Sequence, residues 1–188
     1  MLKFTKMTGL GNDYIYINCM NDNKIDNVED MSKILSDRHF GIGADGIILI
    51  ENSDVADFKM RIFNSDGSEA EMCGNGIRCV GKYVYDNKLT DEQEISIETL
   101  AGIKKLKLLC DSKDNVCEAV EVDMGEPSFK GKDLPVSQED EINKDIYIGA
   151  DGKDYRFTVV SMGNPHAVTF VEDINSIPID KIRTNDRK

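Results

Sequence analysis

The sequence has 188 residues, of which 40% are apolar, and its formal net charge at pH 7 is −12. A chain of this length can bury roughly 70% of its unfolded surface, which indicates a globular protein. The strong negative charge would repel a phosphate backbone, so we expect no nucleic-acid partner. No apolar run approaches the ~20 residues of a membrane-spanning helix, and the opening residues lack the apolar region of a signal peptide. We therefore expect no membrane association and a cytoplasmic location.

The first part of the chain predicts two short strands and a helix. Strands are expected over 2–7 and 13–19, because the stretch between them contains glycines and an asparagine that suit a tight turn. Apolar residues then recur at helical spacing after Asn27, a candidate N-cap. The spacing predicts a helix over about 28–37, and its apolar positions are Val28, Met31, Ile34 and Leu35.

The segment from Gly41 to Gly46 matches the pattern G-x-G-x-x-G of dinucleotide-binding loops. That pattern is informative only after a strand and at the start of a helix. Here a continuous apolar run over 47–50 follows, which is typical of a buried strand. We therefore interpret the segment as a glycine-rich turn.

The middle of the chain predicts one more helix among several strands. Alternating apolar and charged residues predict a strand over 58–62, which ends at the turn 64–67. Apolar residues and a glycine on one face predict a helix over about 75–86. Further alternating stretches lie at 94–99, 103–110 and 116–124. Many strands with few helices indicate an α+β fold in which a sheet packs round the helix 75–86.

The basic residues are not expected to form a binding surface, and the cysteines and histidines are not expected to bind a metal. The densest basic stretch, Lys104, Lys105 and Lys107, alternates with leucines, as on the solvated face of a strand. The five cysteines are odd in number and contain no CxxC pair, so reduced thiols are expected. The two histidines, His39 and His166, lie far apart, and a zinc site would need closely spaced pairs. We expect no metal site.

We place a domain boundary near residue 122, because the strand pattern breaks there and a polar, acid-rich stretch follows. This gives an N-terminal lobe over 1–122 and a partial second lobe over 123–188. In the second lobe only strands near 145–149, 155–161 and 167–171 are predicted, too few for an independent domain. The polar residues 183–188 are expected to form a loose tail.

Cys73 stands immediately before Gly-Asn-Gly, where the helix over 75–86 begins. The start of a helix has unpaired N–H groups that can bind a carboxylate, and glycines let a ligand approach them closely. The same positive end favours the thiolate form of a cysteine beside it. A carboxylate held beside a thiolate suits removal of a proton from the adjacent carbon, so Cys73 is a candidate for α-proton abstraction. Position alone leaves equally open a buried structural cysteine before a capped helix.

A second polar cluster, Ser161-Met-Gly-Asn-Pro-His166, joins two predicted strands. Asn164 precedes a proline and is therefore held extended, so its amide can point at a bound polar group. His166 could tune a nearby thiol as a proton acceptor or as a cation. Taken alone, both residues also fit a structural role at the edge of a strand.

Three motifs together resemble the diaminopimelate epimerase family. Asn64-Ser-Asp-Gly-Ser with Met72-Cys-Gly-Asn-Gly-Ile-Arg-Cys79 resembles its first catalytic motif. Lys6-Met-Thr-Gly-Leu-Gly-Asn-Asp-Tyr14 resembles its N-terminal motif, and the cluster ending at His166 resembles its middle motif. The motifs occur in the family's order, and the resemblance covers nearly the whole chain. It implies two similar lobes, each a mixed sheet wrapped round a central helix, with the active site between them.

The resemblance also implies roles for individual residues. Cys73 would be one of two catalytic cysteines that work on opposite faces of the substrate α-carbon. The backbone N–H groups of Gly74 and Asn75 would hold the reacting carboxylate, and His166 would influence thiol ionisation. The side chains implied to bind other polar groups of the substrate are Asn12, Asn64 and Asn164.

The implied reaction interconverts LL- and meso-diaminopimelate, in lysine and peptidoglycan-precursor biosynthesis, without pyridoxal phosphate or a metal. Family members continue beyond this length with a second cysteine before a glycine-rich helix start, which nothing in this sequence matches. We therefore expect an incomplete second lobe and an isomerase that is at most weakly active as this chain. Apolar strands left exposed in that lobe would favour self-association, for example as a homodimer.

Two alternatives stay open from the sequence. Proline racemases, hydroxyproline dehydratases and the phenazine-pathway isomerase share the implied lobes, and a substrate profile would separate them from a diaminopimelate enzyme. The other alternative is a binding remnant without catalysis. A core thiol of such a remnant would be alkylated slowly and without protection by diaminopimelate.

Overall fold

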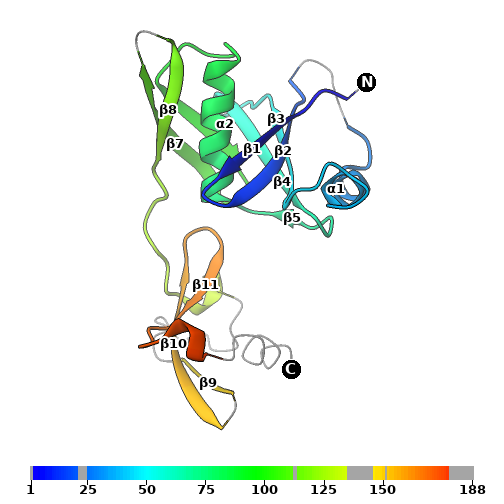
Figure 1. Ribbon diagram of the computed structural model, residues 1–188. Helices are drawn as coiled ribbons and strands as arrows, with labels where there is room; N and C mark the ends of the chain where they lie inside the picture. Colours follow the sequence, from blue (N-terminus) through cyan, green and yellow to red (C-terminus); the bar gives the residue numbers. More distant parts are fainter. Residues whose placement is uncertain (1, 21–24, 112–113, 135–145, 151, 178–188) are drawn as a thin grey trace. The chain divides into compact units, whose positions relative to one another are not determined.

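The computed structural model describes residues 2–20, 25–111, 114–134, 146–150 and 152–177, and the chain divides into two compact units. Unit 1 comprises Met1–Met124 and unit 2 comprises Gly125–Lys188. In the described part of unit 1, α-helices α1 and α2 lie among the strands (Figure 1). Its elements are β1 (Thr5–Gly9), β2 (Asn12–Asn18), α1 (Val28–Ser36), β3 (Gly46–Glu51), β4 (Phe58–Asn64), β5 (Glu69–Ala70), α2 (Gly74–Asp86), β6 (Glu94–Thr99), β7 (Gly102–Asp111) and β8 (Val116–Val122).

The strands of unit 1 form one mixed sheet in the order β1-β2-β3-β4-β6-β7-β8, with β5 paired to β4. The pairs β2–β3 and β4–β6 are parallel, and the other pairs are antiparallel. α2 packs against β1 and β2 from one end of this order and against β7 and β8 from the other. The sheet therefore curls round α2 (Figure 1), which confirms the predicted α+β fold with a central helix.

α2 has this central position because one of its faces is apolar and because a glycine lets it approach the sheet closely. Ile77, Val80 and Val84 repeat at helical spacing and are fully buried. At Gly81 a Cβ would lie 3.0 Å from the Cδ2 atoms of both Leu106 and Leu108 on β7. Glycine therefore lets the helix lie close to the sheet.

The strands β2 and β3 are buried on both faces, which explains the continuous apolar run over 47–50. Ile48 and Ile50 belong to the core that surrounds α2, whereas Ile47 and Leu49 belong to a second core under α1. Strands covered on both faces lose the alternation of polar and apolar residues. The predicted strand is confirmed as β3, and the glycine-rich segment before it leads into this strand and not into a helix.

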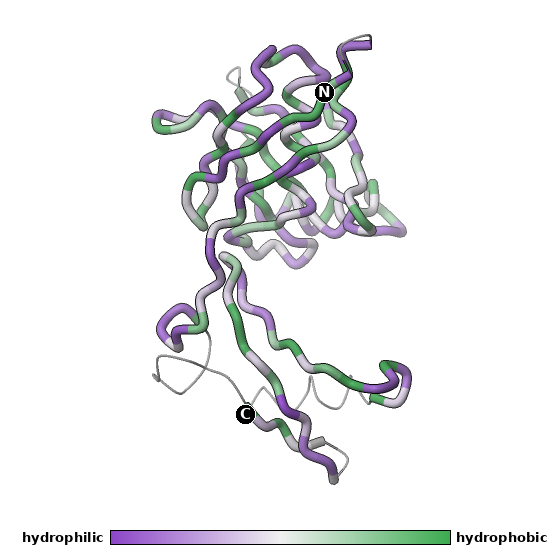
Figure 2. Tube along the Cα trace, turned by 90° about the vertical axis from the view of Figure 1, so that its left-hand side faces the viewer, coloured by the Kyte–Doolittle hydropathy of each residue, from purple (hydrophilic) through white to green (hydrophobic). Residues whose placement is uncertain are grey.

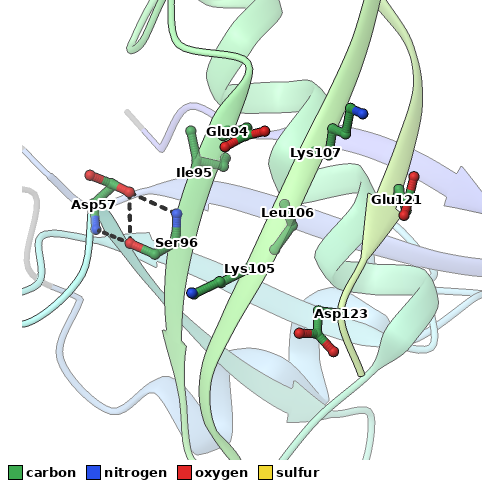
Figure 3. A pocket seen from close by; sticks show the side chains of 9 residues that line it. All are labelled: Asp57, Glu94, Ile95, Ser96, Lys105, Leu106, Lys107, Glu121 and Asp123. Carbon is green, nitrogen blue, oxygen red and sulfur yellow. Dashed lines mark hydrogen bonds between the residues drawn. The ribbon is translucent and has the colours of Figure 1, made fainter. Parts of the chain in front are cut away.

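The outer face of β6, β7 and β8 is charged. A hollow of about 420 Å³ on this face (Figure 3) is bordered by exposed Lys105 and Lys107 and by acidic side chains. Lys107 lies opposite Glu94 on one side and Glu121 on the other, so unlike charges face each other across the strands. This pattern fits a solvated face, as predicted for Lys105 and Lys107.

Lys104 departs from that prediction. It shares the inner face of β7 with the buried Leu106, and its Nζ donates to the backbone oxygen of Met124 at 3.3 Å. Strand alternation places residues two apart on the same face, so only two of the three lysines can point outward.

The predicted buried face of α1 is correct at Val28 and Leu35, which pack against the second core, and wrong at Ile34. Ile34 is 68% exposed, whereas Ser32 is fully buried. The Ser32 hydroxyl donates to the backbone oxygen of Phe63 at 3.1 Å and to that of Asn64 at 2.7 Å, which satisfies it inside the core. Asn27 does precede the helix, but its side chain donates to Asp30 and does not cap the helix amides.

Unit 2 contains a three-stranded antiparallel sheet in the order β11-β10-β9, with β9 at Ile146–Ala150, β10 at Lys153–Ser161 and β11 at Pro165–Val168. The strand predicted at 167–171 was therefore wrong in its bounds, because the turn at 162–164 pairs Pro165 directly with Ser161. Apolar stretches run along these strands (Figure 2), and Phe157 and Val159 on β10 are buried.

Several apolar side chains of unit 2 are exposed, among them Phe170 at 95% and Ile174 at 76%. Self-association through such residues stays a prediction. The tail predicted at 183–188 lies outside the described residues. In the described part of the chain, no helix is long and apolar enough to cross a membrane.

Candidate functional site

The predicted site residues of unit 1 gather at one end of the sheet because of the strand register. Tyr14 on β2 lies beside Gly46 on β3, and Gly46 lies beside Asn64 at the end of β4. Asn12 and Asp45 stand immediately next to this row, at the starts of β2 and β3. At Gly46 a Cβ would collide with the backbone oxygen of Phe63, so only glycine allows the strands to approach so closely.

Cys73 occupies the N-cap position of α2, as the sequence predicts. Its backbone is extended, with φ −137° and ψ 107°, and its Sγ accepts a hydrogen bond from the N–H of Gly76 at 3.3 Å. The N–H groups of Gly74 and Asn75 have no acceptor within the part of the chain that the structure describes. A half-buried sulfur thus stands beside two backbone donors at the positive end of a helix.

The side chain of Tyr14 meets Cys73 from the sheet. Burial raises the pKa of the Tyr14 phenol well above its usual range, and the adjacent Cys73 sulfur raises it further by charge and by hydrogen bonding. The phenol therefore keeps its proton at neutral pH. A protonated phenol can donate its hydrogen bond to a thiolate, which would stabilise the reactive form of the cysteine.

A chain of hydrogen bonds links the start of α2 to the turn between β1 and β2. Asn75 Nδ2 donates to Asn12 Oδ1 at 2.7 Å, and Asn12 Nδ2 donates to Asp45 Oδ2 at 3.1 Å. At the other end, Arg78 Nη2 donates to Asn75 Oδ1. The structure therefore brings Asn12 and Asn75 into direct contact.

Beyond Asp45, two cations and a second carboxylate complete the network. Arg38 binds Asp13 through two hydrogen bonds of 2.7 Å and 3.1 Å, and it also donates to Asp45 at 2.9 Å. The Nζ atom of Lys6 lies 3.1 Å from Oδ2 of Asp13. Chiefly the Arg38 guanidinium, helped by Lys6, holds the pKa of the Asp13 carboxyl well below its usual range.

The other four cysteines lie in different surroundings. Cys79 is 8% exposed on α2, and Cys117 is fully buried on β8. Burial raises the pKa values of the Cys19 and Cys117 thiols to about 11, and for Cys117 the neighbouring Cys110 adds to this effect. All five cysteines are free, and among them Cys73 is at the start of a described α-helix. Among the described residues, no three His, Cys, Asp or Glu side chains form a cluster that could hold a metal ion.

A family model described as diaminopimelate epimerase matches residues 4–130 of the chain. The chain belongs to the diaminopimelate epimerase family. Two curated relatives, both named diaminopimelate epimerase, come from Methanococcus maripaludis and Acetivibrio thermocellus. They are 58% and 54% identical to this chain over 181 residues, and each match covers 96% of the chain. The chain spans 64% of the length of these relatives.

The fold of this diaminopimelate epimerase family member also resembles solved structures. A probable proline racemase from Agrobacterium radiobacter K84 superposes with a TM-score of 0.67 at 16% sequence identity. The match covers 94% of this chain and 54% of that chain. At this identity the likeness shows the fold alone, and it confirms the epimerase-like sheet wrapped round a helix.

Among the residues predicted from the diaminopimelate epimerase motifs, Asn64 lies next to the site and its side-chain amide makes a hydrogen bond within the protein. Its Nδ2 donates to the Ser68 hydroxyl at 3.0 Å, in the turn that leads to β5. Asn164 and His166 lie together in unit 2, where His166 Nδ1 is 3.0 Å from the backbone oxygen of Asn164. His166 is exposed on β11. The participation of these three side chains in substrate binding stays a prediction.

Sequence reasoning missed two side chains of this site, Tyr14 and Arg78, and left the role of a third, Asp45, open. Tyr14 was assigned to a strand, and only the strand register shows that it faces Cys73. Asp45 stands where some family members have glutamine, so the resemblance left open whether it contacts the substrate. The sequence does contain one signal for Arg78, since it follows Asn75 by three residues and so lies on the same side of α2.

Proposed function

We propose that this chain provides the Cys73 half of a diaminopimelate epimerase, an isomerase that interconverts LL- and meso-diaminopimelate. The observation that carries the proposal is the position of Cys73 at the N-cap of α2, next to the N–H groups of Gly74 and Asn75. These donors suit the α-carboxylate of an amino acid. The sequence identity to curated diaminopimelate epimerases supports this choice of substrate.

In the proposed reaction the two N–H groups hold the α-carboxylate, which places the α-carbon near the sulfur. The Cys73 thiolate removes the α-proton, so the C–H bond breaks and an S–H bond forms. The electron pair spreads into the carboxylate, where the positive end of α2 stabilises the added charge. Donors fixed in the folded protein need no rearrangement at this step.

Inversion requires that a second acid return a proton to the opposite face of the α-carbon. Cys19, Cys79, Cys110 and Cys117 do not supply it, because they lie within or next to strands or on the buried face of α2. We therefore propose that this chain exchanges the α-proton with solvent more readily than it forms the opposite epimer.

The remaining assignments belong to the same proposal. Asn12, Asn64 and Asn164 bind the other polar groups of diaminopimelate, and His166 influences thiol ionisation. The thiol chemistry uses neither pyridoxal phosphate nor a metal. The reaction serves lysine and peptidoglycan-precursor biosynthesis in the cytoplasm, and a homodimer remains a proposal without a defined interface.

The test is incubation of the chain with LL- or meso-diaminopimelate in D₂O. We expect deuterium at the α-carbon by mass spectrometry, with little change in the ratio of epimers by chiral chromatography. The control is Cys73→Ser, which replaces the acidic thiol at the helix start by a hydroxyl that is far less acidic. Exchange at equal rates in the two proteins would refute the role of Cys73. Fast formation of the opposite epimer would refute the need for another acid.

A further inference from the structure

The hydrogen-bond chain at the start of α2 has a fixed direction. It runs from Arg78 through Asn75 and Asn12 to Asp45. A guanidinium can only donate hydrogen bonds, and an ionised carboxylate can only accept them. Because the chain has a pure donor at one end and a pure acceptor at the other, each amide between them can adopt only one of its two orientations.

This direction determines which groups remain for a ligand. Each amide uses its oxygen to accept one bond and one of its two N–H hydrogens to donate the next. The second N–H hydrogen of each amide remains. Asn12 and Asn75 therefore present two side-chain donors beside the backbone donors of the helix start.

Asp45 is well suited to fix this arrangement because its own position is fixed from several directions. One of its carboxylate oxygens accepts from Arg38 at 2.9 Å. The other accepts from Asn12 at 3.1 Å and from the backbone N–H of Asp13 at 3.2 Å. The backbone N–H of Asp45 in turn donates to the backbone oxygen of Asp13 at 2.8 Å.

We propose that Asp45 is a positioning residue for the site. Together with Arg78, it fixes the two asparagine amides so that their remaining N–H groups donate to a carboxylate of the ligand. Asp45 itself does not touch the ligand. The inference rests on the proposed function and adds a reason why the site selects a carboxylate.

The first test compares wild-type protein with Asp45→Asn. An amide at position 45 can donate as well as accept, so the direction of the chain is no longer fixed. We expect the meso-diaminopimelate concentration that halves the rate of Cys73 alkylation by iodoacetamide to rise about tenfold or more, because hydrogen bonds to a charged group are lost. The matched control is Asp13→Asn, which removes the other carboxylate of Arg38 but keeps the Asp45–Asn12 bond. In this control, the meso-diaminopimelate concentration that halves the rate of Cys73 alkylation should stay close to the wild-type value.

A second readout needs no ligand. In ¹H–¹⁵N spectra, the side-chain NH₂ signals of Asn12 and Asn75 should shift in Asp45→Asn, while most backbone amide signals stay in place. Unchanged side-chain signals, or half-protection within about twofold of wild type, would overturn the proposal, since the lost bonds predict a larger change. If diaminopimelate fails to protect the wild-type protein, the proposed function fails, and the spectra still decide the role of Asp45.

A double variant separates positioning from simple stabilisation. Asn12→Asp with Asp45→Asn exchanges the carboxylate and the amide, so the hydrogen bonds to Asn75 and to Arg38 can form again. We expect the Asn75 side-chain signal and the stability to return toward wild type. Protection by diaminopimelate should not return, because a carboxylate at position 12 cannot donate. Wild-type protection in the double variant would contradict the claim that donors bind the ligand.

Discussion

The first turn of α2 should be sensitive to a single added methyl group. At Gly76 a Cβ would lie 2.7 Å from Cδ1 of Ile48, which is fully buried on β3. Carbon atoms pack best at about 3.5–4.0 Å, so Gly76→Ala requires a shift of the helix start or of Ile48. The start of α2 also carries Cys73, so its packing determines where the sulfur lies.

The expected magnitude combines two opposing effects. Overpacking a core destabilises by about 1–3 kcal/mol, whereas alanine in a helix is favoured over glycine by about 0.5–1 kcal/mol. We therefore expect Gly76→Ala to lower the free energy of unfolding by about 1 kcal/mol. Ile48→Val removes the Cδ1 methyl and should alone lower it by about 0.5–1.5 kcal/mol. In the double variant the new methyl fills the vacated space, so its stability should be close to wild type.

The assay is urea unfolding followed by circular dichroism at 222 nm, because both described α-helices belong to unit 1. The expected coupling between the two substitutions is about 1.5–2.5 kcal/mol in the favourable direction. Gly76→Ala as stable as wild type, or two substitutions that simply add, would refute the close packing of α2 on β3.

Three further predictions concern single contacts. Tyr14→Phe removes the phenol beside Cys73 and should slow Cys73 alkylation at neutral pH by about tenfold, through loss of a hydrogen bond to the thiolate; an unchanged rate would contradict this contact. Asp13 has a lowered pKa in the folded chain, so its ionised form stabilises the fold above its ordinary pKa of 3.8, and this stability is lost as the pH falls below that value. Asp13→Asn should therefore flatten the acid side of the curve of unfolding free energy against pH, and an unaltered curve would count against the Arg38 pair. Ser32→Ala leaves the backbone oxygens of Phe63 and Asn64 without this donor and should destabilise by about 1–3 kcal/mol in urea unfolding; a change near zero would contradict it.

Elements with a single clear period were predictable from the sequence. The helix that follows Cys73 and the apolar strand at 47–50 were found because their apolar residues follow one pattern throughout. Ile34 was misassigned because periodicity cannot show that a serine hydroxyl will find backbone acceptors in a core, as Ser32 does. The bounds of β11 depend on a hairpin register that its residues do not specify.

The candidate site was predictable only in part, for a similar reason. Cys73 and the adjacent amides follow from their place at a helix start, which is a local property of the sequence. Tyr14 and Asp45 act through contacts with distant residues, and those contacts exist only once β2, β3 and β4 are in register. Local patterns could therefore indicate the candidate thiol but not the side chains that position its neighbours.

The central claim is that Cys73 is a reactive thiol beside a carboxylate-binding helix start. Its most direct test is the rate of iodoacetamide modification of each cysteine at neutral pH, read by peptide mass spectrometry with and without meso-diaminopimelate. We expect Cys73 to react much faster than the buried Cys79 and Cys117, and diaminopimelate to slow the reaction of Cys73 alone. Equal slow reaction of all three thiols, unaffected by diaminopimelate, would contradict it.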